Sequence, residues 1–101
     1  MSTPVQPIVM CRVEFVLTDG SHIYNMEKTF QLPCWMQEGM KLEFDLWSSP
    51  EVSYVTTDPM RCTQNALLRN DLKCRNAEDL RATLKLWIAD DWAIESEDCY
   101  T

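Results

Sequence analysis

The sequence predicts a mainly β domain, a small antiparallel barrel or sandwich of about five strands with one short helical insertion. The chain has 101 residues, which is enough for one small domain. Hydrophobic residues make up 46% of it, too many for a disordered acidic polypeptide. Apolar and polar residues alternate in several short segments separated by turn residues, a pattern typical of an antiparallel sheet with one buried face.

The first two strands are predicted around a tight turn. In residues 11–17, every second side chain is apolar, so these residues form a half-buried strand. Asp19 and Gly20 follow, and this pair favours a hairpin turn because both residues tolerate a positive φ. Residues 22–32 then form the returning strand, which ends at Pro33 because proline has no backbone N–H.

Two further strands are expected in the middle of the chain. Residues 40–46 alternate between apolar and charged side chains, and residues 52–56 are mostly β-branched or aromatic. Residues 60–76 have a different character, and they carry the expected short helical insertion or, as the alternative, form a long, partly ordered excursion. The apolar side chains of this helix would be Ala66, Leu67, Leu68 and Leu72.

Residues 77–88 fit two interpretations. In a helix capped by Asn76, the apolar face would contain Leu80, Leu84, Trp87 and Ile88, and Leu86 would lie outside it. In a strand, alternate residues from Leu80 to Ile88 would all face inward. The second pattern predicts a strand at 81–88 after a helical turn at 77–80, followed by a turn and a last short pairing at 92–94.

These segments define one domain over residues 8–95, with flexible termini at 1–7 and 96–101. Its predicted core consists of large apolar residues on the inward phase of the strands. They are Val13, Phe15, Leu17, Phe30, Leu42, Phe44, Leu46, Val52, Tyr54, Leu84, Leu86 and Ile88. Folding of such a domain requires neither a metal nor a disulfide.

The order of turns and strands resembles that of a known family. A strand, the Thr18-Asp19-Gly20 turn, a second strand ending at Leu32-Pro33, and then Gly39 with a strand-turn-strand resemble small SH3-like barrels of uncharacterised bacterial proteins over residues 8–57. The resemblance implies a barrel closed by the last strand. Residues 60–79 are an insertion relative to this pattern, and the resemblance carries no functional motif.

Charge and cysteine content restrict the partners and the compartment. With 9 basic and 16 acidic residues, the net charge is −7, which opposes binding to nucleic acid or to an anionic membrane. The 5 cysteines include no C-x-x-C pair, and with 1 histidine they form no recognised zinc pattern. We therefore expect free thiols, no metal or cofactor, and, because residues 1–7 do not resemble a secretory signal, a cytoplasmic protein.

The four tryptophans are the predicted partner-binding residues. Trp47 and Trp87 fall on the outward phase of their predicted strands, and Lys85 shares the outward face with Trp87. Trp35 lies in the loop after the second strand, and Trp92 follows a later turn. Exposed indole rings are frequent anchors of interfaces, although these four could instead fill the barrel ends, lie beneath the insertion or form a homodimer seam.

Acidic residues provide a second candidate surface, formed by Glu43, Asp45, Asp90 and Asp91. Such a surface could bind a basic target, or it could simply be solvated. Catalysis has little support, because His22 has no evident partner and no nucleophile or phosphate-loop motif occurs. The sequence therefore predicts a non-enzymatic protein-interaction or self-associating domain, with an acidic inhibitor or nucleic-acid mimic that binds a basic target as the alternative.

Overall fold

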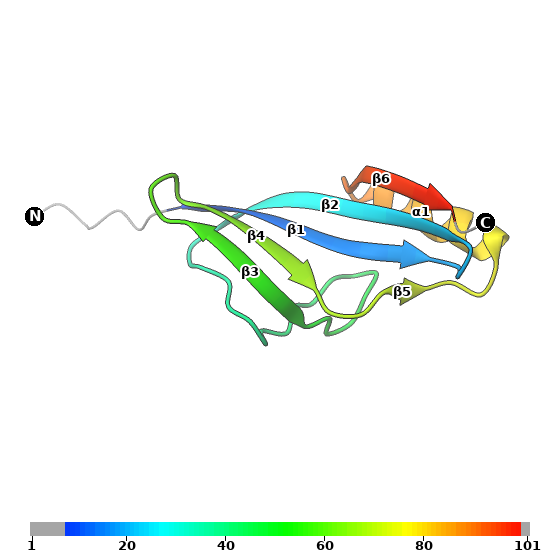
Figure 1. Cartoon of the computed structure of the whole chain (residues 1–101), viewed down its shortest axis with the longest axis horizontal. Coiled ribbons are helices and arrows are strands. Elements are labelled where there is room, and N and C mark those ends of the chain that lie inside the picture. The colour runs from blue at the N-terminus through cyan, green and yellow to red at the C-terminus, as the bar shows by residue number, and fades with distance from the viewer. Residues whose placement is uncertain (1–7, 100–101) are drawn as a thin grey trace, which may run out of the picture.

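A mixed sheet covered on one face by a single helix forms the structure, a computed structural model in which residues 8–99 are described (Figure 1). The elements are β1 (Val9–Thr18), β2 (His22–Leu32), β3 (Val52–Asp58), β4 (Thr63–Leu68), β5 (Leu72–Lys73), α1 (Ala77–Ala89) and β6 (Ala93–Cys99). The last strand runs beyond the pairing expected at 92–94. The flexibility predicted for residues 1–7, 100 and 101 concerns positions outside the described residues.

The strands lie in the order β3-β4-β1-β2-β6, and β5 pairs with β1 beyond the end of β4. Strand β1 is antiparallel to β2 and parallel to β4, whereas β3–β4 and β2–β6 are antiparallel. The predicted mainly β class with one short helix is confirmed. The sheet is open, with β3 and β6 at its edges, and mixed, so it is not a closed antiparallel barrel.

The β1–β2 hairpin forms as its sequence predicts. Phe15 lies opposite Met26 in the register, and both side chains are buried on the face that carries α1. At the turn, Gly20 has φ +97°, a conformation that costs glycine little. The Thr18 hydroxyl accepts a hydrogen bond from the Gly20 N–H and donates one to the His22 carbonyl, which fixes the turn.

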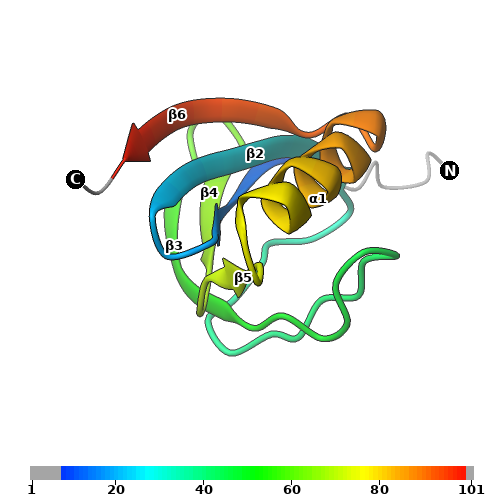
Figure 2. The same ribbon diagram turned by 90° about the vertical axis from the view of Figure 1, so that its right-hand side faces the viewer.

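Residues 40–46 alternate in burial but do not form the predicted strand. Leu42, Phe44 and Leu46 pack against the core, while the charged residues between them are exposed. Only isolated bridges occur here, because the Phe44 and Trp47 backbones bond to each other across a tight turn. The two-residue period therefore reflects burial of a loop against the inner face of the sheet. Figure 2 shows this loop on the same side as α1.

The helix predicted within residues 60–76 is wrong, because this segment contains β4 and β5. Burial alternates along β4, where Gln64, Ala66 and Leu68 face the core. Gln64 is satisfied in this position: its amide accepts from the Met36 N–H and donates to the Met36 carbonyl, at 2.8 and 2.7 Å. Pairing with β1 and β3 outweighs the helix propensity of the leucines.

The strand predicted at 81–88 is also wrong, since residues 77–89 form α1. The Asn76 side chain accepts a hydrogen bond from the Asp79 N–H at 2.8 Å and so caps the helix. Helical spacing turns Leu80 and Trp87 towards the sheet, whereas the predicted core residues Leu86 and Ile88 are 57% and 47% exposed. Tyr54, also assigned to the core, is exposed on the outer face of β3.

Aromatic rings around Phe15 hold the helix to the sheet. The centroid of the Phe15 ring lies 4.6 Å from that of Trp87, 5.0 Å from Trp92 and 5.4 Å from Trp47. Trp87 and Trp92 themselves meet edge to face at 5.2 Å. Four segments of the chain therefore converge on one buried cluster, which we call the aromatic cluster (Phe15, Trp47, Trp87 and Trp92).

We expect Trp87→Ala to lower the free energy of unfolding by about 3–5 kcal/mol, because it removes a fully buried indole and leaves a cavity. Leu86→Ala, one position earlier on the same helix, removes an exposed side chain and should change it by no more than about 0.5 kcal/mol. Urea denaturation of both variants measures the difference. If both variants lost the same free energy of unfolding, the orientation of α1 in this structure would be contradicted.

Candidate functional site

The structure buries two of the four tryptophans that were predicted to bind a partner. Trp87 is 1% exposed, so the outward position predicted for it is wrong, and Trp92 is 3% exposed. Trp35 and Trp47 are half-buried, and Trp47 packs against Phe15. Lys85 is exposed on α1, but two helical positions separate it from the buried Trp87, so the two side chains do not share a face. Trp87 and Trp92 therefore belong to the core, and Trp47 packs against it.

The structure instead brings two of the predicted acidic residues together. Asp45, in the turn at 44–47, and Asp90, the C-cap of α1, line one hollow of about 220 Å³. Its remaining lining residues are apolar: Leu46, Leu86 and Ala89. We call this hollow the acidic groove. Sequence reasoning found its carboxylates but assigned the exposed Leu86 to the core, whereas Leu46 both packs against the core and lines the groove. The position of Leu86 outside the apolar stripe of the helical interpretation was the available signal.

The acidic groove lies at the C-terminal end of α1, where the helix dipole concentrates negative charge. The last turn of α1 contains no basic residue, and Asp90 and Asp91 follow it directly. Lys28 partly compensates this negative charge, because its ammonium donates a hydrogen bond to the Asp90 carbonyl at 2.7 Å. The same ammonium lies 5.3 Å from the centre of the Phe30 ring. The Asp90 and Asp45 carboxylates add to the negative potential of this end of the helix.

Glu43 and Asp91 take different positions from Asp45 and Asp90. Glu43 lines a separate hollow of about 180 Å³ whose other residues are apolar, and it accepts a hydrogen bond from the Ser49 hydroxyl at 3.3 Å. Those apolar residues are Phe30, Leu32, Met36, Leu42 and Phe44. Asp91 is exposed in the turn after α1, with φ +67°. The four predicted acidic residues are thus divided between two hollows and a turn.

Another charged cluster lies on the outer face of the sheet, away from α1. The Arg12 guanidinium pairs with Glu14 at 2.8 Å, with Glu95 at 2.7 Å and with Glu27. A register shift in the β2–β6 pairing, next to Met26, places Glu95 beside the other two glutamates. Three carboxylates this close could ligate a cation, but Arg12 already supplies a positive charge to all of them. The arrangement ties β6 to β1 and β2.

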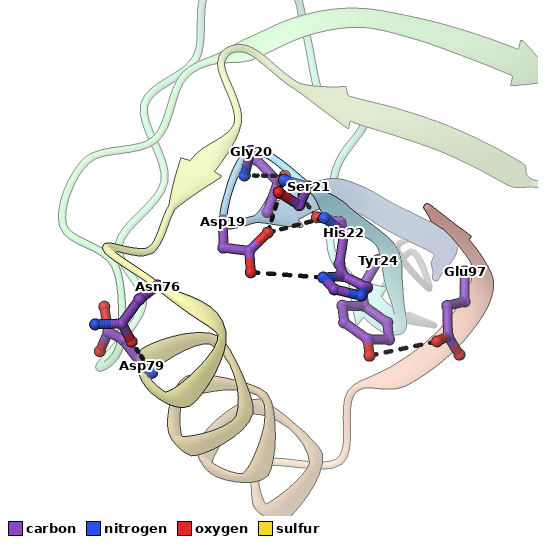
Figure 3. A network of polar contacts seen from close by, with 9 residues as sticks. Asp19, Gly20, Ser21, His22, Tyr24, Asn76, Asp79 and Glu97 are labelled. Carbon is purple, nitrogen blue, oxygen red and sulfur yellow. Dashed lines mark hydrogen bonds and ion pairs between the residues drawn. The ribbon is translucent and has the colours of Figure 1, made fainter. Parts of the chain in front are cut away.

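His22 belongs to the β1–β2 turn (Figure 3). The Asp19 carboxylate accepts hydrogen bonds from the backbone N–H groups of His22 and Ser21, and these bonds lower its pKa. The His22 ring lies 3.6 Å from the same carboxylate. Two residues further along β2, the Tyr24 hydroxyl donates to Glu97 on β6 at 3.4 Å. These contacts stabilise the turn and the β2–β6 pairing.

Comparisons with known proteins add no relative: no family model, no curated protein and no solved structure matches this chain. Within residues 8–99, no helix is long and apolar enough to cross a membrane.

We predict that Glu14→Gln stabilises the protein at neutral pH. Burial raises the pKa of Glu14 above its usual value of 4.5, and the neighbouring Glu95 raises it further, while Arg12 acts in the opposite direction. A raised pKa in the folded state means that stability falls as the pH rises from about 4.5 through the folded pKa. The glutamine variant does not lose stability in this way, so the difference in stability between the variant and the wild type should shrink as the pH approaches 4.5.

Thermal unfolding across this pH range measures the effect. Glu38→Gln removes the same charge from an exposed loop and serves as the control. A glutamine variant at position 14 that is less stable than the wild type at pH 7 would contradict the prediction.

Proposed function

We propose that this chain is a non-enzymatic protein-interaction domain that binds a basic segment of a partner protein in the acidic groove. The observation that carries the proposal is that Asp45 and Asp90 line the same hollow as the apolar residues Leu46, Leu86 and Ala89. The two residues come from segments far apart in the sequence, and the fold brings them to the same hollow.

A lysine or arginine side chain has the chemistry that this groove would accept. Its aliphatic stem would cover Leu46 and Leu86, and its charged head would reach the carboxylates. The negative end of α1 favours the same charge, and the net charge of −7 would steer a basic partner towards the domain. The exposed Leu86 supports this proposal, because an apolar side chain that is 57% exposed gains contact area when a partner covers it.

An acidic inhibitor or nucleic-acid mimic is the alternative proposal for the same carboxylates. A mimic would depend on charge alone, so its binding would not require the floor of the groove. Binding in the groove requires both the carboxylates and Leu86. We further propose a cytoplasmic location, which is supported by the free thiols of Cys11, Cys34, Cys62 and Cys74.

The test uses a short fluorescent peptide of alternating arginine and leucine, with its binding followed by anisotropy at low and high salt. We expect the double variant Asp45→Asn/Asp90→Asn to weaken binding about tenfold or more, a change of ~1.4 kcal/mol. The control is Asp71→Asn/Glu78→Gln, which removes the same charge from exposed positions outside the groove. Equal weakening by the two double variants would show nonspecific attraction to the acidic surface and contradict the proposal.

Leu86→Ala separates the groove from the alternative. If the peptide lies in the groove, this substitution weakens binding severalfold, and the loss persists at high salt because it removes apolar contact. If the protein acts as a charge mimic, Leu86→Ala leaves the affinity unchanged.

A further inference from the structure

The two edges of the sheet differ in their protection against pairing with another strand. Edge strand β6 carries Glu95, Glu97 and Asp98, and its pairing with β2 contains a register shift. Charges and irregularities of this kind keep an edge from joining another sheet. Strand β3 contains neither a charge nor a proline from Val52 to Thr57. Its residues are β-branched, aromatic or small, which makes this edge suited to strand pairing.

Most of the β3 edge has no partner in the described part of the chain. Val52 is covered, since its N–H donates to the Met40 carbonyl and its carbonyl accepts from the Gly39 N–H, both at 2.8 Å. Beyond this point β3 pairs only with β4. Residues 53–58, which we call the open edge, therefore present one side of the backbone to solvent. Pro59 limits the open edge at its far end.

We propose that a second copy of this chain pairs antiparallel with the open edge, so that the two sheets become one. Residues directly opposite each other must lie on the same face of the joined sheet. Centring the two-fold axis on Val55 would place Asp58 of the second copy opposite Val52, where Met40 and Gly39 already bond. Centring it on Thr56 avoids that overlap and places Thr56 opposite the same residue of the second copy.

Charge is what identifies the occupant as a second copy. Pairing β6 with itself would set acidic side chains against acidic ones, whereas the open edge is uncharged up to Asp58. With the axis at Thr56, the end of β3 near Arg61 would lie beside the beginning of β3 in the second copy, where Glu51 is already paired with Arg69 at 3.0 Å and would be shared with Arg61. The Arg61 side chain is 82% exposed and only loosely paired with Asp58, at 3.8 Å. In this register no two like charges lie opposite each other, because Asp58 faces Tyr54 of the second copy, so the open edge can pair with itself.

This interface would be small. Two short strands bury less than the roughly 1,600 Å² of a standard protein–protein interface, so we expect a dimer that dissociates on dilution. The exposed Tyr54 would add contact area on the outer face. The open edge and the acidic groove are built from different residues, so neither proposal depends on the other.

Sedimentation velocity over a range of concentrations tests the proposal, with the wild type, Thr56→Lys, Thr56→Glu and an equimolar mixture of the two variants. Thr56 is exposed, so both variants should fold, as circular dichroism will check. Each substitution places a charge opposite its own copy across the axis and should abolish the dimer. The mixture places lysine opposite glutamate and should restore it. Gln31→Lys, at an exposed position on β2 opposite the uncharged Met10, is the matched control and should leave the dimer intact.

The outcomes separate this dimer from other forms of association. A wild type that stays monomeric at every concentration overturns the proposal. A dimer that survives Thr56→Lys uses another surface, which also overturns it. If both single variants are monomeric but the mixture does not associate, the second copy does not pair about Thr56, and the proposal fails in that case as well.

Discussion

The aromatic cluster around Phe15 is the interaction on which the rest of this structure depends. Phe15 lies in the central strand β1, and the three tryptophans that contact it come from the 44–47 turn, from α1 and from the segment that leads into β6. Each ring pair combines burial of a large apolar area with a favourable tilted or edge-to-face geometry. The cluster therefore holds the helix and the loop against the same face of the sheet.

The acidic groove is a consequence of this packing. Trp87 fixes the rotation of α1, which leaves Leu86 and Ala89 facing outward, and Trp47 fixes the turn that carries Asp45 and Leu46. The groove lies between these two anchored segments. On the outer face no helix or loop of residues 8–99 provides such a cover, and there the polar cluster of Arg12 with three glutamates connects β1, β2 and β6.

Local signals in the sequence were sufficient for some elements and not for others. The β1–β2 hairpin was predictable because the Asp19-Gly20 turn and the alternation on both sides specify it without long-range contacts. The segment containing α1 was ambiguous because alternate residues from Leu80 to Ile88 fit a strand, whereas the Asn76 cap and the helical spacing of Leu80, Leu84 and Trp87 favoured the helix that forms. At residues 40–46, alternation described burial correctly and pairing incorrectly, because this segment forms only isolated bridges, Lys41 with Glu51 and Phe44 with Trp47.

The same ambiguity reversed the predicted orientations of side chains at the candidate site. A two-residue period placed Trp87 outward and Leu86 inward, and the helical period reverses both positions. The acidic residues could be identified from composition, but the proximity of Asp45 and Asp90 could not, because it depends on where α1 packs. The open edge of β3 was equally hidden, since strand order in a mixed sheet is set by long-range pairing.

Hydrogen exchange of the four indole N–H groups, followed by NMR, tests the aromatic cluster most directly. The indole nitrogens of Trp87 and Trp92 are buried, so the account predicts that these two protons exchange slowly and that those of Trp35 and Trp47 exchange faster. Rapid exchange at Trp87 would contradict it, because the helix would then not be seated on Phe15.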